Sequence, residues 1–522
     1  MGGYRYPAAV SATTTPQYIG LDVGTTSLKG ALIDATGTFL ATASVSYGVS
    51  RPRPGWSEQD PADYASAAIQ CIRELVASPH ADPSRIASLC SSGQAPTLVL
   101  LDRDHKPIRP AILWQDTRAA AEAAALSKAA GSVALDDLLG MRWPVDASWP
   151  LARGRWLARH EPDTIARLAH ILLPKDYVHF VLTGSMRTDA WSAKGLVHQG
   201  TLHPISGMRD LGDLPPEAVP VAGTPRDVVG TITADVARVT GLPTGLRVVC
   251  GWSDAMAAML GSGAFGHAGT ACDVSGTSEV TGVTVPSEAQ DTGPLMTARI
   301  VDTGRWILYG PTQASGASLG WIMRTVNVPV EDTSPDARQA AALALAATVE
   351  PGAGGLTFLP YLEGERAPIW NPRARGAFTG LSISSEPGHL IRAVLEGVAC
   401  SVRHILEYAV QYGHTPIREV RVAGGGARAQ LWNQIKADLT GLDFRPCATT
   451  ENGVLGSAML GAVGVGDFPD LSVAGDAMVH LGQTVHPDPA SREIYDELFR
   501  RYVGLYPAIS GVTASRSDLH GG

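Results

Sequence analysis

Two stretches of this chain share one pattern: an apolar run, a turn rich in glycine, threonine and serine, and a second apolar run. The first occupies 18–33 around the turn 23–27, and the second occupies 271–285 around the turn 276–278. Apolar runs of this length on either side of a short polar turn predict two β-strands joined as a hairpin. Because the two units lie roughly 250 residues apart, they predict a chain of two related lobes with a boundary near 261–263.

The remaining pattern predicts a mixed α/β protein with many short elements. The 522 residues include 57 glycines and 36 prolines, which favour tight turns. Asp60 followed by proline predicts a helix start, and apolar residues recur at helical spacing over 61–76. Further along, 417–423 predicts a strand and 427–440 a helix. A phosphate or nucleotide can closely approach the glycine turn 424–426 between them.

The charge of the chain excludes some partners. Its formal net charge is −9, from 41 Lys and Arg against 50 Asp and Glu, and its isoelectric point is about 5.9. Nucleic acids and anionic membranes attract basic surfaces, so neither is an expected partner. The longest nearly apolar stretch, 340–347, is far shorter than the ~20 residues that cross a bilayer, and the N-terminus lacks a signal core. We expect a cytoplasmic protein with unpacked ends at 1–16 and after Val512.

The six cysteines are scattered and have no CxxC spacing, so they predict neither a zinc site nor a disulfide framework. We interpret them as small buried hydrophobic residues in a reducing compartment.

Two short motifs are misleading. The pattern GxGxxG at 261–266 follows a helical stretch rather than a strand, so it does not predict a dinucleotide site. The pattern GxSxG at 316–320 follows 311–315, which shows no clear strand, and is interpreted as a helix packed through small residues. No P-loop pattern occurs.

Three turns rich in glycine, threonine and serine offer N–H and hydroxyl donors that suit phosphate oxygens. Asp22, at the end of the first apolar run, is either a ligand of Mg²⁺ or an ordinary turn residue. Asp254 follows the strand-like run 246–250, at a strand-to-helix junction of the kind where α/β sheets bind ligands. On spacing alone, a helix N-cap is the stronger interpretation of Asp254.

Taken together, these residues resemble the FGGY family of carbohydrate kinases, within the actin and hexokinase superfamily, from about 17 to 505. Residues 22–29 resemble the family's first phosphate motif, 276–278 the second, and 424–427 the adenosine motif.

Longer segments carry the resemblance further. Residues 376–396 fit the long C-terminal signature of the family at every restricted position. The shorter signature at 148–160 is imperfect, because Arg153 and Gly154 stand where Lys and an apolar residue are expected. Residues 54–61, 113–118 and 172–177 look like segments of xylulokinase-type members, without being part of either signature.

The resemblance implies an α/β fold of two ribonuclease-H-like lobes, with ATP and sugar in the cleft between them. The implied N-terminal lobe, 17–262, holds the sugar and the first phosphate motif, and the implied C-terminal lobe, 263–505, binds ATP. Asp254 is then the catalytic base and Asp22 the Mg²⁺ ligand. The implied sugar-binding residues are Gln94, Trp114, Asp116 and Asp254, and the implied ATP-binding residues are Thr25, Thr26, Ser27, Lys29, Gly276, Thr277, Gly424, Gly425, Gly426 and Asn433.

The sequence departs from the family pattern in the segment implied to contact the acceptor. Ala95-Pro96 stand where xylulokinases typically carry Met-His and glycerol kinases Arg-Glu. A site that hydrogen-bonds its substrate discriminates strongly, so this change leaves the identity of the polyol open. We predict a kinase dependent on ATP and Mg²⁺ that phosphorylates a hydroxyl of a small ketose, with D-xylulose first. Lobe closure is expected to exclude water.

Two alternatives and one question stay open. The first alternative is a kinase for another polyol such as ribulose, erythritol or glycerol. The second is a non-catalytic ATP-binding regulatory protein, against which the presence of both Asp22 and Asp254 argues. A homodimer is also left open.

Overall fold

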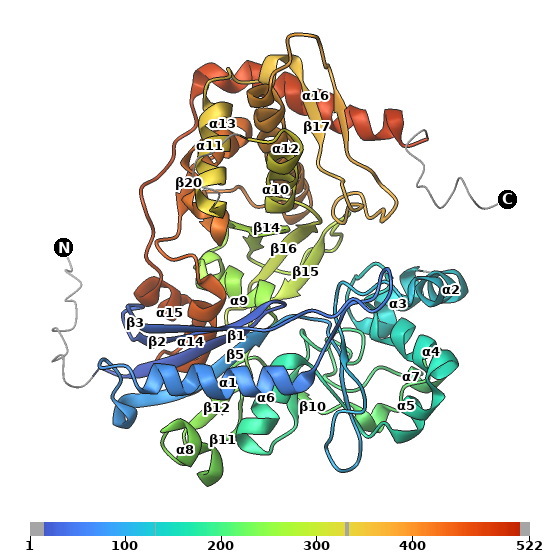
Figure 1. Cartoon of the computed structure of the whole chain (residues 1–522), viewed down its shortest axis with the longest axis vertical. Coiled ribbons are helices and arrows are strands. Elements are labelled where there is room, and N and C mark those ends of the chain that lie inside the picture. The colour runs from blue at the N-terminus through green and yellow to red at the C-terminus, as the bar shows by residue number, and fades with distance from the viewer. Residues whose placement is uncertain (1–14, 131, 329–333, 512–522) are drawn as a thin grey trace. The chain divides into compact units, whose positions relative to one another are not determined.

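The computed structural model describes residues 15–130, 132–328 and 334–511, so most of the two predicted unpacked ends lies outside the described residues (Figure 1). The chain divides into two compact units. The first takes the residues up to Gly261 together with Gly453–Val479, and the second takes Ser262–Asn452 and the chain from His480 onward.

A six-stranded sheet forms the centre of the first unit, in the order β11-β12-β5-β1-β2-β3. Strands β1, β2 and β3 form an antiparallel meander, β5 and β12 run parallel to β1, and β11 is antiparallel to β12. The first predicted hairpin is therefore confirmed as β1 and β2. The bounds are β1 (Gln17–Val23), β2 (Ser27–Asp34), β3 (Phe39–Ser46), β5 (Ile86–Gly93), β11 (Val228–Thr231) and β12 (Arg247–Val249).

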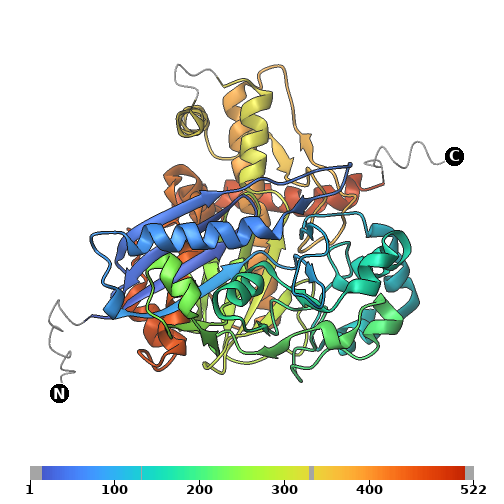
Figure 2. The same ribbon diagram turned by 60° about the horizontal axis from the view of Figure 1, so that its bottom comes forward.

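Helix α1 (Pro61–Val76) lies along this sheet (Figure 1, Figure 2) and confirms the predicted helix. Its cap is Asp60, whose carboxylate accepts a hydrogen bond from the Ala62 N–H at 2.9 Å. A Cβ on Gly30 of β2 would lie 2.6 Å from the Cys71 sulfur, so the glycine lets the helix approach the strand.

The segment Gly453–Val479 supplies helices to the same unit. A Cβ on Gly20 of β1 would lie 2.2 Å from the carbonyl oxygen of Val454, which shows how closely α14 (Asn452–Gly464) packs on the strand. Further helices of this unit are α2 (Ala120–Ala130), α3 (Ser132–Leu139), α4 (Pro150–His160), α5 (Pro162–Arg167), α6 (Pro174–Thr183), α7 (Met208–Gly212), α8 (Ala234–Thr240), α9 (Asp254–Gly261) and α15 (Leu471–Met478).

Three two-stranded ribbons complete the first unit. They are β4 (Glu58–Gln59) with β7 (Ala111–Ile112), β6 (Val99–Leu101) with β8 (His170–Leu172), and β9 (Arg187–Asp189) with β10 (Val221–Gly223).

The second unit repeats the plan of the first. Its sheet has the order β15-β16-β14-β13-β19-β20. β14 pairs antiparallel with both β13 and β16, whereas β19 is parallel to β13 and β20 is parallel to β19. The second predicted hairpin is confirmed as β13 and β14. The bounds are β13 (Thr270–Ser275), β14 (Glu279–Val285), β15 (Met296–Arg299), β16 (Trp306–Thr312), β19 (Glu419–Ala423) and β20 (Phe444–Pro446).

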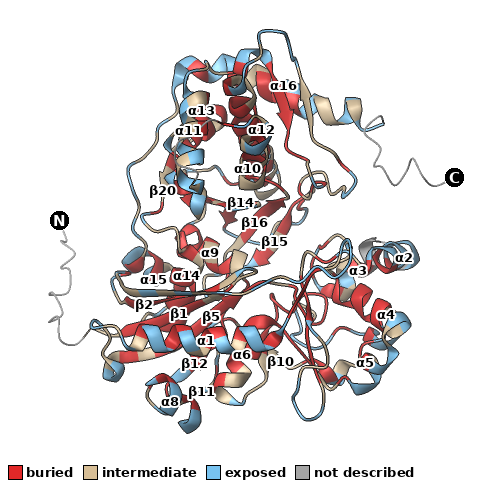
Figure 3. Ribbon diagram, in the orientation of Figure 1, coloured by how far each residue is buried: buried red, intermediate tan, exposed pale blue. Residues whose placement is uncertain are grey.

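Long helices pack on this second sheet. The core of the unit joins α12 (Pro387–Gly413) to the predicted helix after the glycine turn, α13 (Gln430–Thr440). The central strands of both sheets are largely buried, whereas the edge strands β3, β11 and β20 are largely half-buried or exposed (Figure 3). Further elements are α10 (Gly316–Thr325), α11 (Pro335–Ala347), α16 (Arg492–Ile509) and the ribbon of β17 (Thr357–Leu359) with β18 (Ala377–Thr379).

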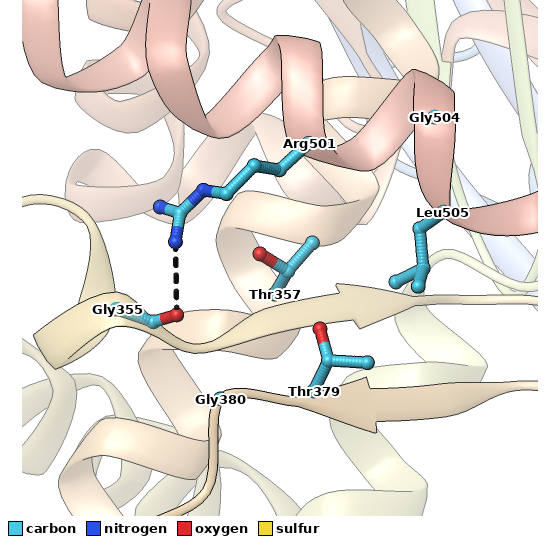
Figure 4. Close-up of a pocket in the computed structure, with 7 residues that line it drawn as sticks. All are labelled: Gly355, Thr357, Thr379, Gly380, Arg501, Gly504 and Leu505. Atoms are coloured by element: carbon cyan, nitrogen blue, oxygen red, sulfur yellow. Dashed lines mark hydrogen bonds between the residues drawn. The ribbon is translucent and has the colours of Figure 1, made fainter. Parts of the chain in front are cut away.

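A surface groove of about 350 Å³ lies beside that ribbon (Figure 4). Arg501 of α16 reaches across it and donates a hydrogen bond to the Gly355 carbonyl at 3.2 Å. The groove is lined by Gly355, Thr357, Thr379, Gly380, Arg501, Gly504 and Leu505, none of which belongs to the predicted site.

The structure shows what surrounds the GxSxG pattern at 316–320. Residues 311–312 belong to β16, so the expectation of no strand before GxSxG is wrong. β15 pairs with β16 only as far as Tyr309, so Pro311, which has no N–H, lies beyond that pairing, and its carbonyl accepts from the Ala367 N–H at 3.0 Å. Ser318 is nevertheless buried inside α10 and donates to the Ala314 carbonyl at 3.1 Å, so the packing-helix interpretation is confirmed.

All six cysteines are free and buried, as predicted. Among the described helices, none has both the length and the apolar character that a bilayer span requires.

Candidate active site

One edge of the first sheet gathers the predicted acidic residues. The carboxyl ends of β1, β5 and β12 meet there because these strands are parallel. Asp22 of β1 is in register with Ser92 of β5, and the Gly93 N–H donates to the Trp252 carbonyl at 3.3 Å, two residues before Asp254. The fold therefore brings Asp22, the end of β5 just before Gln94, and Asp254 to one sheet edge.

Asp22 is half-buried, and its Oδ1 accepts a hydrogen bond from the Ser92 hydroxyl at 2.7 Å. A Cβ on Gly453 would lie 3.3 Å from Asp22 Oδ2, so the start of α14 passes close to the carboxylate. Mg²⁺ is commonly held by one or two carboxylates together with water and substrate phosphates. Asp22 offers one such carboxylate at the end of β1, beside the first phosphate turn, and its role as a Mg²⁺ ligand stays a prediction.

The first phosphate turn keeps its carbonyl groups occupied. The Tyr47 hydroxyl donates to the Gly24 carbonyl at 2.7 Å, and Gln59 Nε2 donates to the Thr25 carbonyl at 2.6 Å. The backbone N–H groups of Thr25 and Thr26 have no hydrogen-bond partner within the described part of the chain. Such N–H groups at a turn form an anion-binding site.

The next two predicted ATP-binding residues belong to β2. Ser27 begins the strand and Lys29 lies opposite Asp22 in the hairpin; both are half-buried. Their contact with a phosphate stays a prediction.

Asp254 is half-buried at the first position of α9, and its Oδ1 accepts from the Ala255 N–H at 2.7 Å. The turn before it is fixed from two sides. A Cβ on Gly251 (φ +72°) would lie 1.8 Å from the Ser91 carbonyl oxygen, so that only glycine fits. The buried Lys175 ammonium donates to the Cys250 carbonyl at 3.1 Å.

The three other predicted sugar-binding residues have protein partners. Trp114 is half-buried and its indole Nε1 donates to Thr25 Oγ1 at 3.1 Å. Gln94 is 1% exposed and its amide donates to the Gly24 carbonyl at 3.2 Å. Asp116 is also 1% exposed, and Arg118 Nη2 lies 2.7 Å from its Oδ2. Gln94 and Asp116 are thus held by hydrogen bonds within the protein, and their contact with a sugar stays a prediction.

Sequence reasoning missed three residues that support Gln94 and Asp116: Gln59, Trp56 and Arg118. Gln59 bridges the first phosphate turn and Gln94 through a 3.0 Å hydrogen bond, and Arg118 stacks on Trp56 with 3.7 Å between Cζ and the ring centroid. Gln59 and Trp56 lie in 54–61 and Arg118 in 113–118, two segments that carry the family resemblance outside the phosphate motifs. That membership is the one signal in the sequence that could have identified them.

The hairpin tip of the second unit resembles that of the first. The Gly276 carbonyl accepts from the Gly316 N–H at 3.0 Å, and the Thr277 carbonyl accepts from the Ser315 and Ala317 N–H groups, each at 3.1 Å. Thr277 is exposed, and its own N–H has no hydrogen-bond partner in the described residues. The first turn of α10 is therefore occupied by the tip, and the Thr277 N–H stays available to an anion.

The glycine turn packs against the end of β13. A Cβ on Gly424 would lie 2.6 Å from the Ser275 carbonyl oxygen, and one on Gly426 would lie 2.5 Å from the Ser275 side chain. Gly425 is exposed and a Cβ there would meet no atom within 4 Å. The turn thus presents open backbone at its centre, where a planar ligand can approach closely.

Asn433 is 2% exposed, and its Nδ2 donates to the Ala427 carbonyl at 3.0 Å. It therefore supports the glycine turn from α13, and its contact with adenine stays a prediction.

Each of the two α/β units thus has a hairpin tip with N–H groups that could donate to an anion. The profile of the FGGY family of carbohydrate kinases, N-terminal domain, matches 17–261, and that of the C-terminal domain matches 272–465. The chain belongs to the FGGY family of carbohydrate kinases, and it is a sugar kinase.

Individual relatives match this chain over nearly its whole length. A xylulose kinase of Staphylococcus epidermidis is 28% identical over 95% of this chain and 97% of its own. An Escherichia coli protein named L-xylulose/3-keto-L-gulonate kinase is 28% identical over 96% of this chain and 98% of its own. The crystal structure of a xylulose kinase from Rhodospirillum rubrum superposes with a TM-score of 0.85 at 33% identity, covering 95% of this chain and 99% of that one. These findings confirm the expected two-domain α/β fold class and favour the enzyme over the non-catalytic alternative.

Proposed function

We propose that this chain transfers the γ-phosphoryl group of ATP to a hydroxyl of a small ketose, with D-xylulose as the leading acceptor. The observation that supports this proposal best is the position of Asp254, half-buried at the sheet edge that also carries Asp22 and the first phosphate turn. Relatives that cover nearly the whole chain are named xylulose kinases, which agrees with a ketopentose acceptor.

Asp254 is proposed as the general base. A sugar hydroxyl is a poor nucleophile at neutral pH, and a carboxylate that accepts its proton in the transition state accelerates the reaction by roughly 10²–10⁴-fold. The Asp254 carboxylate takes the hydroxyl proton while the hydroxyl oxygen bonds to the γ-phosphorus and the bond to the β-phosphate oxygen breaks. Gly251 and Lys175 hold the preceding turn, so the base keeps its position during the reaction.

The phosphates are proposed to bind the two hairpin tips. The N–H groups of Thr25, Thr26 and Thr277 are the donors for phosphate oxygens, and the open backbone at Gly425 faces the adenosine. Asp22 is the residue proposed to hold Mg²⁺, directly or through water, and the ion neutralises phosphate charge when it is bound. Since the reaction uses ATP and all six thiols are free, we place the enzyme in the cytoplasm.

A second acceptor is supported by one specific feature. Ala95-Pro96 replace the polar pair expected beside the sugar, and a relative of equal coverage is named for L-xylulose and 3-keto-L-gulonate. L-Xylulose is therefore the runner-up acceptor, ahead of ribulose, erythritol and glycerol.

An acceptor screen tests the proposed function. Purified protein with ATP and MgCl₂ is given each of these polyols in turn, and ADP release is followed against a reaction without acceptor. We expect stimulation by a ketopentose, with the largest kcat/KM for D-xylulose. ADP release that no ketose stimulates would contradict the proposal, and a preference for L-xylulose would replace the leading acceptor with the runner-up.

A further inference from the structure

Arg153 of α4 is a guanidinium with no exposed surface whose hydrogen bonds all go to backbone carbonyl groups. Its Nη1 lies 2.7 Å from the Pro96 carbonyl oxygen and 3.3 Å from that of Ile112, and its Nη2 lies 2.5 Å from that of Leu113. One side chain thus joins three carbonyl groups from two segments of the first unit.

The charge of Arg153 is not balanced by a direct ion pair. Among the described residues no carboxylate oxygen forms a salt bridge with it, and its Nε has no hydrogen-bond partner. Asp116, a nearby carboxylate, is instead bonded to Arg118 and to the Ser57 N–H. Burial lowers the pKa of Arg153 to about 10. An unpaired buried cation is costly to desolvate, and the three carbonyl groups that accept from the guanidinium offset part of that cost.

The carbonyl groups belong to the two segments that flank the proposed acceptor site. Pro96 follows Gln94 at the end of β5, and Leu113 precedes Trp114, whose indole reaches Thr25 in the first phosphate turn. The Thr97 hydroxyl accepts from the Trp114 N–H at 3.1 Å, so the segments are paired next to the guanidinium. Leu98 and Ile112 also exchange two backbone hydrogen bonds, at 3.1 and 3.2 Å. Arg153 adds the contact that ties Pro96 itself, two residues before Leu98, to Leu113.

The helix that carries Arg153 is itself held in place. A Cβ on Gly154 would lie 2.0 Å from the Gly212 carbonyl oxygen, so α4 packs on α7 at backbone contact. The planar fork of arginine spans both segments at once, which the single ammonium of lysine cannot do with the same geometry. Because the helix is fixed and the guanidinium is rigid, the Pro96 and Leu113 carbonyl groups are held at a defined distance from each other.

We propose that Arg153 is a positioning residue that sets acceptor specificity by fixing the Ala95-Pro96 turn relative to Trp114. This inference rests on the proposed function, in which the acceptor binds beside these segments. Its consequence is that the choice among small ketoses and polyols depends on a residue that does not touch them.

The test compares R153K and R153M with wild type in steady-state kinetics, using D-xylulose, L-xylulose, D-ribulose and glycerol as acceptors. For R153K we expect the acceptor KM to rise about tenfold and the order of kcat/KM among acceptors to change, while the KM for ATP stays within about twofold. R153M removes all three hydrogen bonds. The Ile112 and Leu113 carbonyl groups keep the N–H groups of Leu98 and Asp116 as donors, but Pro96 loses its donor, so we expect R153M to have a lower Tm than R153K. R159K on the same helix, where the side chain is 64% exposed, is the matched control and is expected to match wild type.

Each outcome decides a different point. If wild type turns over an acceptor and R153K keeps its KM and its preference while Tm falls, Arg153 is only structural and the inference is overturned. If wild type turns over none of the acceptors, the proposed function fails and the inference fails with it.

Discussion

Lys436 Nζ lies 2.6 Å from Oδ2 of Asp273, and neither side chain is more than 1% exposed. Glu279 Oε1 is the second partner of the same ammonium, also at 2.6 Å. Asp273 and Glu279 flank the second hairpin tip, and Lys436 is on the helix that follows the glycine turn. One buried cation thus ties together the two segments of this unit that are proposed to bind ATP.

Replacing Lys436 should weaken the second unit. In Lys436→Met two buried carboxyl groups lose their cation, which typically costs about 3–5 kcal/mol. For a unit of this size we expect Tm to fall by roughly 10 °C in a thermal melt. Lys128→Met, at an exposed position in α2, is the control and should leave Tm nearly unchanged. Equal melting of the two variants would remove the structural role assigned to Lys436.

Glu279 should make ATP binding depend on pH. Burial, and then the Asp273 carboxylate, raise the pKa of Glu279 from 4.5 to about 8, although Lys436 opposes the shift. The folded protein therefore binds the proton more tightly than the unfolded chain, so stability falls as pH rises from about 4.5 to about 8 and is constant above. Deprotonation also places a negative charge beneath the tip that is proposed to bind phosphate.

We expect the KM for ATP in wild type to rise by up to about tenfold between pH 7 and pH 9, one unit above that pKa. Glu279→Gln keeps the shape and the neutral charge of the protonated acid, so its KM should stay flat over the same range. The measurement is steady-state kinetics at saturating acceptor. Parallel profiles for the two proteins would contradict this prediction.

The glycine turn offers a matched pair of substitutions. Gly425→Ala adds a methyl group in open space, so we expect stability to stay level or rise by about 0.4–1 kcal/mol while the KM for ATP rises. Gly426→Ala places its methyl group 2.5 Å from Ser275 and should lower Tm as well. Gly504→Ala in α16, also in open space, should stabilise without any change in KM. A Gly425→Ala variant that binds ATP normally would move the adenosine away from this turn.

Asp22 should determine the metal requirement. EDTA is expected to abolish ADP release, and added MgCl₂ should restore it. Asp22→Asn retains the shape but loses the charge, so we expect kcat to fall by about 10²-fold and half-maximal activity to need more Mg²⁺. Titration of each protein with MgCl₂ measures both effects. An unchanged midpoint in the variant would show that Asp22 does not hold the ion.

Local signals explain how much of the fold could be predicted. The two hairpins and α1 follow from turn chemistry, a capping aspartate and apolar periodicity, all of which act over a few residues. The packing of α14 on β1 could not be predicted, because the contact between Gly20 and Val454 joins positions far apart in the sequence. The residue pattern of α14 gives no sign of which sheet it covers.

In the candidate site, too, local features could be predicted and contacts between distant segments could not. The phosphate turns were visible as glycine, threonine and serine around strand ends, and the structure brings Asp22 and Asp254 to one edge through parallel pairing. The burial of Gln94 and Asp116 could not be predicted, because the sequence around a polar residue does not show whether its side chain contacts a sugar or other protein groups. The role of Arg153 likewise depends on carbonyl groups from two distant segments.

The most direct measurement is the turnover of Asp254→Asn with the best acceptor at saturating ATP and Mg²⁺. Asparagine cannot accept the hydroxyl proton, so the account predicts a fall in kcat of roughly 10²–10⁴-fold with ATP affinity kept. Asp235→Asn, at an exposed position in the first turn of α8, is the matched control and should turn over like wild type. An Asp254→Asn enzyme with wild-type kcat would contradict the central claim that this carboxylate activates the sugar hydroxyl.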